Sequence, residues 1–255
     1  MTTSPYFTHI DAVNPENMDK GDGWLITEFR LPFSERQGAA TTMFHARFNP
    51  GSVHKKHRHT NCEEIYYLVS GTGIAGAGGA TEEIRAGHFH YVPADTEHWL
   101  VNANADVPIE VIGWYLGAGS VAATGYTYAG DVTEADRAGP HEGYTVGALA
   151  HADDSEQAGA MRVGLGERQG IGHTAWQMSV NKADGRQAQR LARADAFLYV
   201  ASGRGRAGVG DETTEVSKGS CVHVPAGAAF WLEADSDAPL TVVGLYEGVG
   251  SPAAA

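Results

Sequence analysis

Residues 51–64 read Gly51-Ser-Val-His-Lys-Lys-His57-Arg-His59-Thr-Asn-Cys-Glu-Glu64 and are the most informative part of the chain. His57 and His59 are two residues apart, so on a β-strand both imidazoles leave the same face. Glu64 opens the next predicted strand, and His98 follows a turn rich in Pro and Asp. Three imidazoles and one carboxylate at these spacings predict a divalent metal site on neighbouring strands. Nitrogen and oxygen ligands without thiolate suit Fe(II), Mn(II), Ni(II), Cu(II) or Zn(II).

The chain repeats itself with a shift of 132 residues. The segment Glu35-Arg-Gln-Gly38 matches Glu167-Arg-Gln-Gly170, and Tyr67–Gly73 matches Tyr199–Gly205. Several single turn residues keep the same register: Gly87, Val92, Pro93 and Ala94 match Gly219, Val224, Pro225 and Ala226. Register kept over so many turn residues predicts two copies of one β domain. We expect an N-terminal domain at 1–120, a linker at 121–150 and a C-terminal domain at 151–255.

Short segments of alternating apolar residues predict strands rather than helices. They lie at 41–48, 64–69, 88–92 and 109–115, separated by Gly- or Pro-containing turns such as 70–80. Within the linker, 131–137 fits a short capped helix. Two all-β domains of this size predict barrels or jelly rolls, which close or double the sheet to hide its edges.

Composition excludes several classes of function. A net charge of −13 argues against a nucleic-acid or anionic-membrane partner, because both need a basic face. Met1–Asp11 has neither a basic region nor an apolar run, and no stretch approaches the roughly 18 apolar residues of a membrane span. Cys62 and Cys221 are predicted to be unpaired thiols, with one long-range bridge as the alternative. A soluble cytoplasmic protein is expected.

Two motifs resemble those of the cupin superfamily. The first, Gly-x5-His-x-His-x4-Glu-x6-Gly, is met by Gly51, His57, His59, Glu64 and Gly71. The second, Gly-x5-Pro-x-Gly-x2-His-x3-Asn, is met by Gly87, Pro93, His98 and Asn102, with Asp95 in place of the usual glycine. That position is a turn, where Asp is tolerated better than most residues.

The resemblance implies a bicupin, an all-β chain of two tandem jelly-roll barrels of the double-stranded β-helix type. It also implies His57, His59, Glu64 and His98 as metal ligands. Glu63 competes with Glu64 for the ligand role, but strand parity and the spacing to Gly71 favour Glu64.

The second copy lacks the ligands. At the same shift the four ligand positions become Gln189, Leu191, Ala196 and Phe230, whereas the turn glycines and Pro225 persist. Leu, Ala and Phe side chains offer no metal-binding atom. We therefore expect a C-terminal barrel without metal, with a structural or pocket-shaping role.

Other side chains are candidates for the substrate pocket. His45 and Arg47 share a face of the strand before the first motif, where an inward Arg would suit an anionic substrate. Aromatic residues that flank the ligands or end a strand are candidate pocket walls: Tyr66, Trp99, Trp114 and Tyr115. His54 is expected in an exposed loop. His88 and His90 either point into the barrel as a proton relay or face solvent.

The leading prediction is a metal-dependent enzyme that acts on a small organic molecule, with Glu64 and His98 in catalytic roles. Four protein ligands leave two open positions on an octahedral ion, which an enol, phenol or carboxylate oxygen and dioxygen would occupy. The resemblance makes a dioxygenase with one ion per chain, Fe(II) favoured, the first expectation. The alternatives are an isomerase, cyclase, decarboxylase or lyase, or a non-catalytic protein that binds a small ligand. The resemblance is also compatible with a homodimer.

Overall fold

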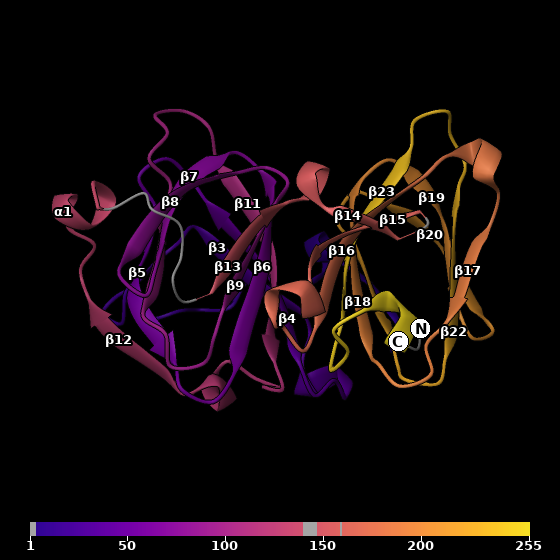
Figure 1. Cartoon of the computed structure of the whole chain (residues 1–255), viewed down its shortest axis with the longest axis horizontal. Coiled ribbons are helices and arrows are strands. Elements are labelled where there is room, and N and C mark those ends of the chain that lie inside the picture. The colour runs from indigo at the N-terminus through magenta and orange to yellow at the C-terminus, as the bar shows by residue number, and fades with distance from the viewer. Residues whose placement is uncertain (1–3, 140–146, 159) are drawn as a thin grey trace. The chain divides into compact units, whose positions relative to one another are not determined.

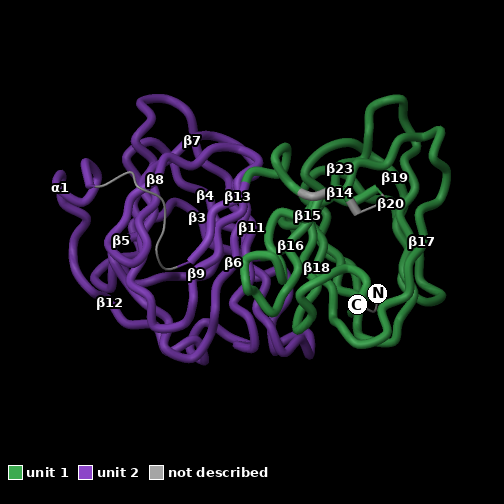
Figure 2. The backbone as a smooth tube through the Cα atoms, in the orientation of Figure 1, with its two compact units in different colours: residues 1–13, 151–255 green, residues 14–150 purple. Residues whose placement is uncertain are grey.

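The structure is a computed structural model that describes residues 4–139, 147–158 and 160–255. It consists of β-strands wrapped around apolar interiors, with short helical turns between them (Figure 1). Two compact units are present, residues 14–150 and residues 1–13 with 151–255 (Figure 2). The predicted all-β class is confirmed. In the part of the chain that is described, no helix is long and apolar enough to cross a membrane.

The unit of residues 14–150 contains two sheets of six strands each. The first sheet holds β2 (Trp24–Leu25), β5 (Val53–His59), β7 (Thr72–Ala77), β8 (Ala80–Arg85), β10 (His98–Val101) and β12 (Tyr126–Gly130). The second holds β3 (Glu28–Phe33), β4 (Thr42–Phe48), β6 (Glu63–Ser70), β9 (His88–Val92), β11 (Ile109–Leu116) and β13 (Ala148–His151). A cluster of buried aromatic and aliphatic side chains, including Phe29, Phe44 and Leu68, fills the space they enclose.

The unit that includes residues 151–255 contains sheets of seven and four strands. The larger sheet holds β1 (Phe7–His9), β14 (Glu156–Ala158), β15 (Met161–Leu165), β16 (Thr174–Val180), β18 (Ala196–Ser202), β21 (Ser220–Val224) and β23 (Leu240–Tyr246). The smaller holds β17 (Gln187–Arg190), β19 (Arg204–Val209), β20 (Glu212–Ser217) and β22 (Ala229–Ala234). The interior of this unit is filled by its own cluster of buried apolar side chains.

The predicted repeat is confirmed by local structure. Both copies of the Glu-Arg-Gln-Gly segment form a 3-10 turn, at Glu35–Gln37 and Glu167–Gln169. Each turn ends on a glycine in the left-handed region, Gly38 and Gly170, a conformation that costs glycine little. The other 3-10 turns are at Ile10–Ala12, Ala122–Thr124, Ala152–Asp154, Lys182–Asp184 and Pro252–Ala254.

The units differ from the domain bounds predicted from sequence. β1 precedes the first copy in the chain but pairs with β21 of the second, and β13 precedes the second copy but pairs with β9 of the first. The predicted linker at 121–150 is therefore largely part of the N-terminal unit, since β12 also pairs with β5. The predicted capped helix is confirmed as α1 (Glu134–Arg137), in which Thr133 and Asp136 form a capping box.

The Gly-rich segment 70–80 was predicted to be a turn, and this is wrong for most of its length. Residues 72–77 form β7, which pairs with both β8 and β10. Glycine is required there because the Trp99 indole lies against the backbone of Gly76: a Cβ on Gly76 would stand 2.2 Å from that ring. Gly208 and Trp231 form the same contact in the second copy, also at 2.2 Å.

Candidate metal centre

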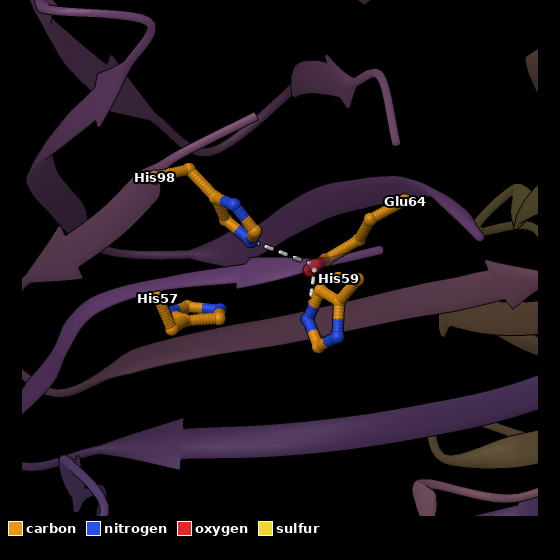
Figure 3. A group of neighbouring side chains, drawn as sticks. All are labelled: His57, His59, Glu64 and His98. Carbon is orange, nitrogen blue, oxygen red and sulfur yellow. Dashed lines mark hydrogen bonds and ion pairs between the residues drawn. The ribbon is translucent and has the colours of Figure 1, made fainter. Parts of the chain in front are cut away.

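Three strands bring the predicted ligands together. β5 carries His57 and His59, β6 carries Glu64, and β10 begins with His98, which pairs with His57 across the sheet. One donor atom from each of these four residues lies within 4.8 Å of the donor atoms of the others. Figure 3 shows the imidazoles converging on the Glu64 carboxylate. All four side chains are buried, none more than 6% exposed.

Backbone carbonyls fix the orientation of two of these imidazoles. The Nδ1–H of His57 donates to the carbonyl oxygen of Lys55 at 2.7 Å, and the Nδ1–H of His98 donates to that of Thr96 at 2.9 Å. The first bond leaves the Nε2 of His57 directed into the cluster, and the second leaves the Nε2 of His98 facing the Glu64 carboxylate. A hydrogen bond of this kind, made by the ring nitrogen that does not bind the metal, sets the tautomer of metal-binding histidines.

The cluster contains polar atoms that a metal ion would satisfy. The Nε2 of His57 and both ring nitrogens of His59 are buried and have no hydrogen-bond partner among the described residues. The His59 Nε2 lies 3.3 Å from Glu64 Oε2 without the alignment of a hydrogen bond, whereas the His98 Nε2 is bonded to the same oxygen at 3.0 Å. Burying unsatisfied nitrogens is costly, so these residues fit a divalent ion held by three nitrogens and one oxygen.

The electrostatics of the cluster favour the protonation states that a metal requires. Burial lowers the pKa of His57 and of His59 below the ordinary value, so both are neutral at pH 7. Burial acts to raise the pKa of Glu64, but its close contacts with the imidazoles of His59 and His98 outweigh it, and the pKa lies well below its ordinary value. Neutral imidazoles and an ionised carboxylate are the metal-binding forms.

A small cavity opens beside the ligands. The centres of water-sized molecules have about 30 Å³ of space in it, next to His57, Glu64 and His98. The rest of its wall is largely apolar and aromatic: Ile26, Phe29, Phe44, Ala46, Phe48, His54, Tyr66, Trp99, Leu100, Val111 and Tyr115. The arrangement suits a small substrate held away from bulk water.

The structure divides the predicted pocket residues into two groups. Tyr66, Trp99 and Tyr115 line the cavity, as predicted. His45 and Arg47 do not, because on β4 it is the alternate residues Phe44, Ala46 and Phe48 that face the cavity.

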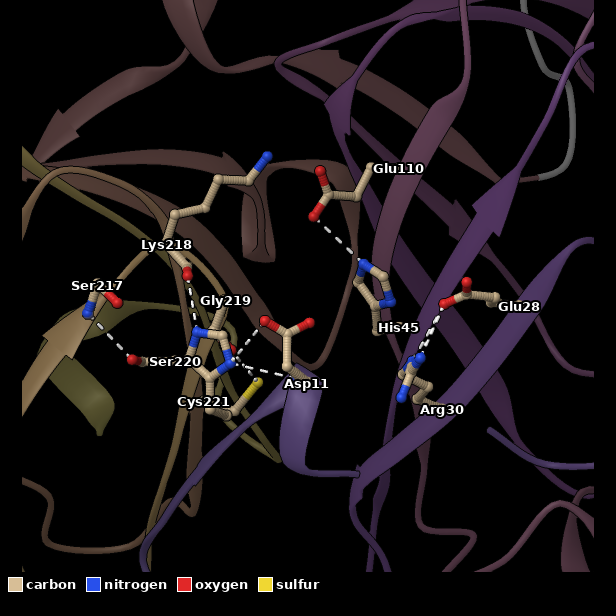
Figure 4. Close-up of polar contacts among 11 residues, drawn as sticks. Asp11, Glu28, Arg30, His45, Glu110, Ser217, Lys218, Gly219, Ser220 and Cys221 are labelled. Atoms are coloured by element: carbon tan, nitrogen blue, oxygen red, sulfur yellow. Dashed lines mark hydrogen bonds and ion pairs between the residues drawn. The ribbon is translucent and has the colours of Figure 1, made fainter. Parts of the chain in front are cut away.

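The two residues on the outer face of β4 have other partners. The His45 Nε2 lies 3.2 Å from Glu110 Oε1 (Figure 4), and the exposed Arg47 donates to Asn49. Trp114 is fully buried beside Met43 and Ile65 and lies on the face of β11 opposite to Val111 and Tyr115. His45, Arg47 and Trp114, which were predicted as pocket candidates, therefore do not line this cavity.

The histidines outside the ligand set are also placed. His54 was expected in an exposed loop, but it lies on β5, is 9% exposed and lines the cavity. His90 is fully buried and shares a hydrogen bond between its Nδ1 and the Tyr66 hydroxyl. Burial lowers the pKa of His90 to about 3, so its imidazole is neutral. His88 is half-buried and accepts a hydrogen bond from the Arg85 N–H.

Two finer expectations of the motif hold. Glu63 faces away from the cluster and accepts a hydrogen bond from the Tyr91 hydroxyl at 2.6 Å, which leaves the ligand role to Glu64. Asp95, in the place of the usual glycine, adopts a φ of 58°. Its N–H donates to the carbonyl oxygen of His59, and its carboxylate lies 3.5 Å from Arg58. Asp tolerates this left-handed turn better than most residues.

The corresponding positions of the second copy have different surroundings. Leu191, Ala196 and Phe230 belong to the apolar core of the C-terminal unit. Gln189 accepts a hydrogen bond from the Tyr246 hydroxyl at 2.5 Å. Both cysteines are buried free thiols, as predicted.

The chain matches the cupin domain family over residues 44–115 and again over residues 179–246. Among curated relatives, it is 45% identical over 56 residues to dimethylsulfoniopropionate lyase DddW of Ruegeria pomeroyi, a match that covers 22% of this chain and 36% of the lyase. It is 30% identical over 105 residues to the uncharacterized protein MJ1618 of Methanocaldococcus jannaschii, which covers 41% of this chain and 81% of that protein. The chain thus spans about a third of the length of the lyase.

Two solved structures show a similar fold. Protein YlbA of E. coli superposes with a TM-score of 0.74 at 14% identity, over 94% of this chain and 89% of that one. Oxalate decarboxylase of Bacillus subtilis superposes with a TM-score of 0.73 at 13% identity, over 98% of this chain and 79% of that one. At these identities the likeness concerns the fold alone.

Proposed function

Since the chain belongs to the cupin domain family, carrying that domain twice, we propose that it is a metal-dependent enzyme that cleaves a small carboxylate without consuming dioxygen. The observation that carries this proposal is the buried cluster of His57, His59, Glu64 and His98, which adjoins a small, largely apolar cavity. A buried ligand set beside an enclosed cavity is the arrangement of a catalytic rather than a structural metal.

The four ligands would hold one divalent ion, which when bound supplies a Lewis acid for a carboxylate or enolate oxygen. The aromatic wall excludes water from the bound substrate and thereby strengthens the electrostatic contacts that hold it. Tyr66 lines this wall, and its hydroxyl is hydrogen-bonded to the neutral imidazole of His90. We assign to this pair the holding and movement of the proton that bond cleavage requires, at the Tyr66 hydroxyl oxygen.

Two of the relatives named above support the proposed reaction class. One is named as a lyase and one as a decarboxylase, both for a carboxylate substrate, and none of them is named as an oxygenase. The expectation of a dioxygenase therefore has no support, and the lyase or decarboxylase alternative is the better one. The small size of the cavity also favours a small substrate.

The test is turnover by the metal-loaded protein with a panel of small carboxylates, including oxalate and dimethylsulfoniopropionate. Protein loaded in turn with Fe(II), Mn(II), Ni(II), Cu(II) and Zn(II) is incubated with and without dioxygen, and products are identified by proton NMR. We expect cleavage of one carboxylate at the same rate under both conditions, lost in His59→Ala. Turnover that requires oxygen and consumes it would contradict the proposal.

A further inference from the structure

His54 is a cavity residue for which the ligand motif gives no role. Its ring stacks on that of His57 with centroids 3.7 Å apart and planes at 23°, and the indole of Trp24 lies against it at 4.1 Å. His54 lines the same cavity as His57, Glu64 and His98. A side chain so placed touches both a metal ligand and the space that a substrate would fill.

An irregularity in β5 turns His54 toward the cavity. His57 pairs with His98 and His54 pairs with Leu100, so three steps along β5 oppose two steps along β10. This is a β-bulge, and it leaves the adjacent residues Lys55 and Lys56 both pointing away, in ion pairs with Asp131 and Asp136. Bulges are frequent beside active sites because they re-aim a side chain.

The Nε2 edge of the His54 ring has no hydrogen-bond partner among the described residues, and this nitrogen is buried. Trp24 and His57 cover the faces of the ring and offer no acceptor to its edge. Buried polar atoms in folded proteins are nearly always satisfied, so an orphan nitrogen at a cavity wall indicates a bond made to a ligand.

We propose that His54 is a substrate-contacting residue whose Nε2–H donates a hydrogen bond to a carboxylate oxygen of the molecule bound beside His57. Its ring also positions the His57 imidazole by stacking. The inference rests on the proposed function only in taking a small carboxylate as the ligand. Because neutral imidazole carries a single N–H, the contact gives direction as well as affinity.

Two variants separate the hydrogen bond from the stacking. His54→Phe keeps an aromatic ring between Trp24 and His57 but removes the nitrogen, whereas His54→Gln places an amide near the Nε2 position and removes the ring. His173→Phe, a half-buried histidine in the other unit, serves as a matched control. Zinc content, melting temperature and calorimetric binding of propionate are measured for each Zn(II)-loaded protein.

We expect His54→Phe to retain one zinc and its melting temperature but to bind propionate about tenfold or more weakly, since a hydrogen bond to a charged group is lost. His54→Gln should bind propionate more tightly than His54→Phe, and His173→Phe should match the parent protein in zinc content and propionate binding. In a sample labelled with 15N on histidine, propionate should also shift the His54 Nε2 resonance, a readout available if His54→Phe does not fold.

Propionate binding that is unchanged in His54→Phe, or absent from the zinc-loaded parent protein, would overturn the proposal. An unshifted Nε2 resonance in propionate-saturated protein would do the same. If propionate binding depends on His54 but the protein turns over no carboxylate, the proposed function is refuted and the proposed His54 contact stands. If the parent protein and His54→Phe turn over a carboxylate with the same KM, the proposed His54 contact is refuted and the proposed function stands.

Discussion

The rings of His54 and His57 stack with centroids 3.7 Å apart although the two residues are three positions apart on one strand. On a regular strand such residues face opposite sides of the sheet. The extra residue of the bulge in β5 brings both rings to the cavity side. Two of the four metal ligands, His57 and His59, and the group assigned to substrate contact therefore come from one short segment, whose two lysines face outward.

Removing the Tyr66 hydroxyl should abolish turnover without removing the metal. Tyr66→Phe keeps the aromatic wall of the cavity but deletes the oxygen bonded to His90. We expect kcat to fall by about 10²- to 10⁴-fold, the usual contribution of a positioned acid or base, with unchanged metal content. Tyr67→Phe is the matched control, because Tyr67 is equally buried but does not line the cavity. Equal activity in both variants would remove Tyr66 from the mechanism.

The metal-free protein should lose stability as the pH falls below 6.5. The pKa values of His57 and His59 lie below the ordinary 6.5, so under more acidic conditions the unfolded chain binds protons that the folded chain does not. Each such histidine lowers the free energy of unfolding by up to about 1.4 kcal/mol per pH unit. Glu64, whose pKa is lowered from 4.5, adds a further loss below that pH.

Urea denaturation of the metal-free protein between pH 5 and 8 measures this dependence. The contribution of these histidines to the free energy of unfolding should be constant above pH 6.5 and should decrease below it. In His57→Gln, which cannot take up the proton, the slope should be smaller by about one proton. Identical slopes in the two proteins would show that His57 is not held neutral by burial.

The two glycines beneath the tryptophans should resist substitution equally. Gly76→Ala and Gly208→Ala each place a Cβ 2.2 Å from an indole, so each should cost about 1–3 kcal/mol of unfolding free energy through overpacking. Gly172→Ala, where no atom lies within 4 Å of the added carbon, should be close to neutral. The measurement is chemical denaturation of the three variants. A neutral Gly76→Ala would mean that Trp99 is free to move.

The ligands and the repeat could be predicted from sequence because both depend on local spacing. His57 and His59 face the same way on any regular strand, and among the described residues every position of positive φ except Asp95 is a glycine. The capping box at Thr133 is likewise a local pattern.

Features set by non-local packing were not predictable. On β4, Phe44 and Ala46 alternate with Met43 and His45, and burial does not tell the two faces apart because Met43 and His45 are buried as well. The bulge that re-aims His54 depends on its pairing with β10, far along the chain. The pairing of β1 with β21 joins segments more than 200 residues apart, for which no local pattern exists.

Metal stoichiometry of the purified protein tests the central claim most directly. Elemental analysis after loading with a divalent ion and removal of excess should give one ion per chain, because the four ligands are present only in the first copy. His57→Ala and His59→Ala should each lose the ion while Gln189→Ala keeps it. Two ions per chain, or full retention in the histidine variants, would contradict the account.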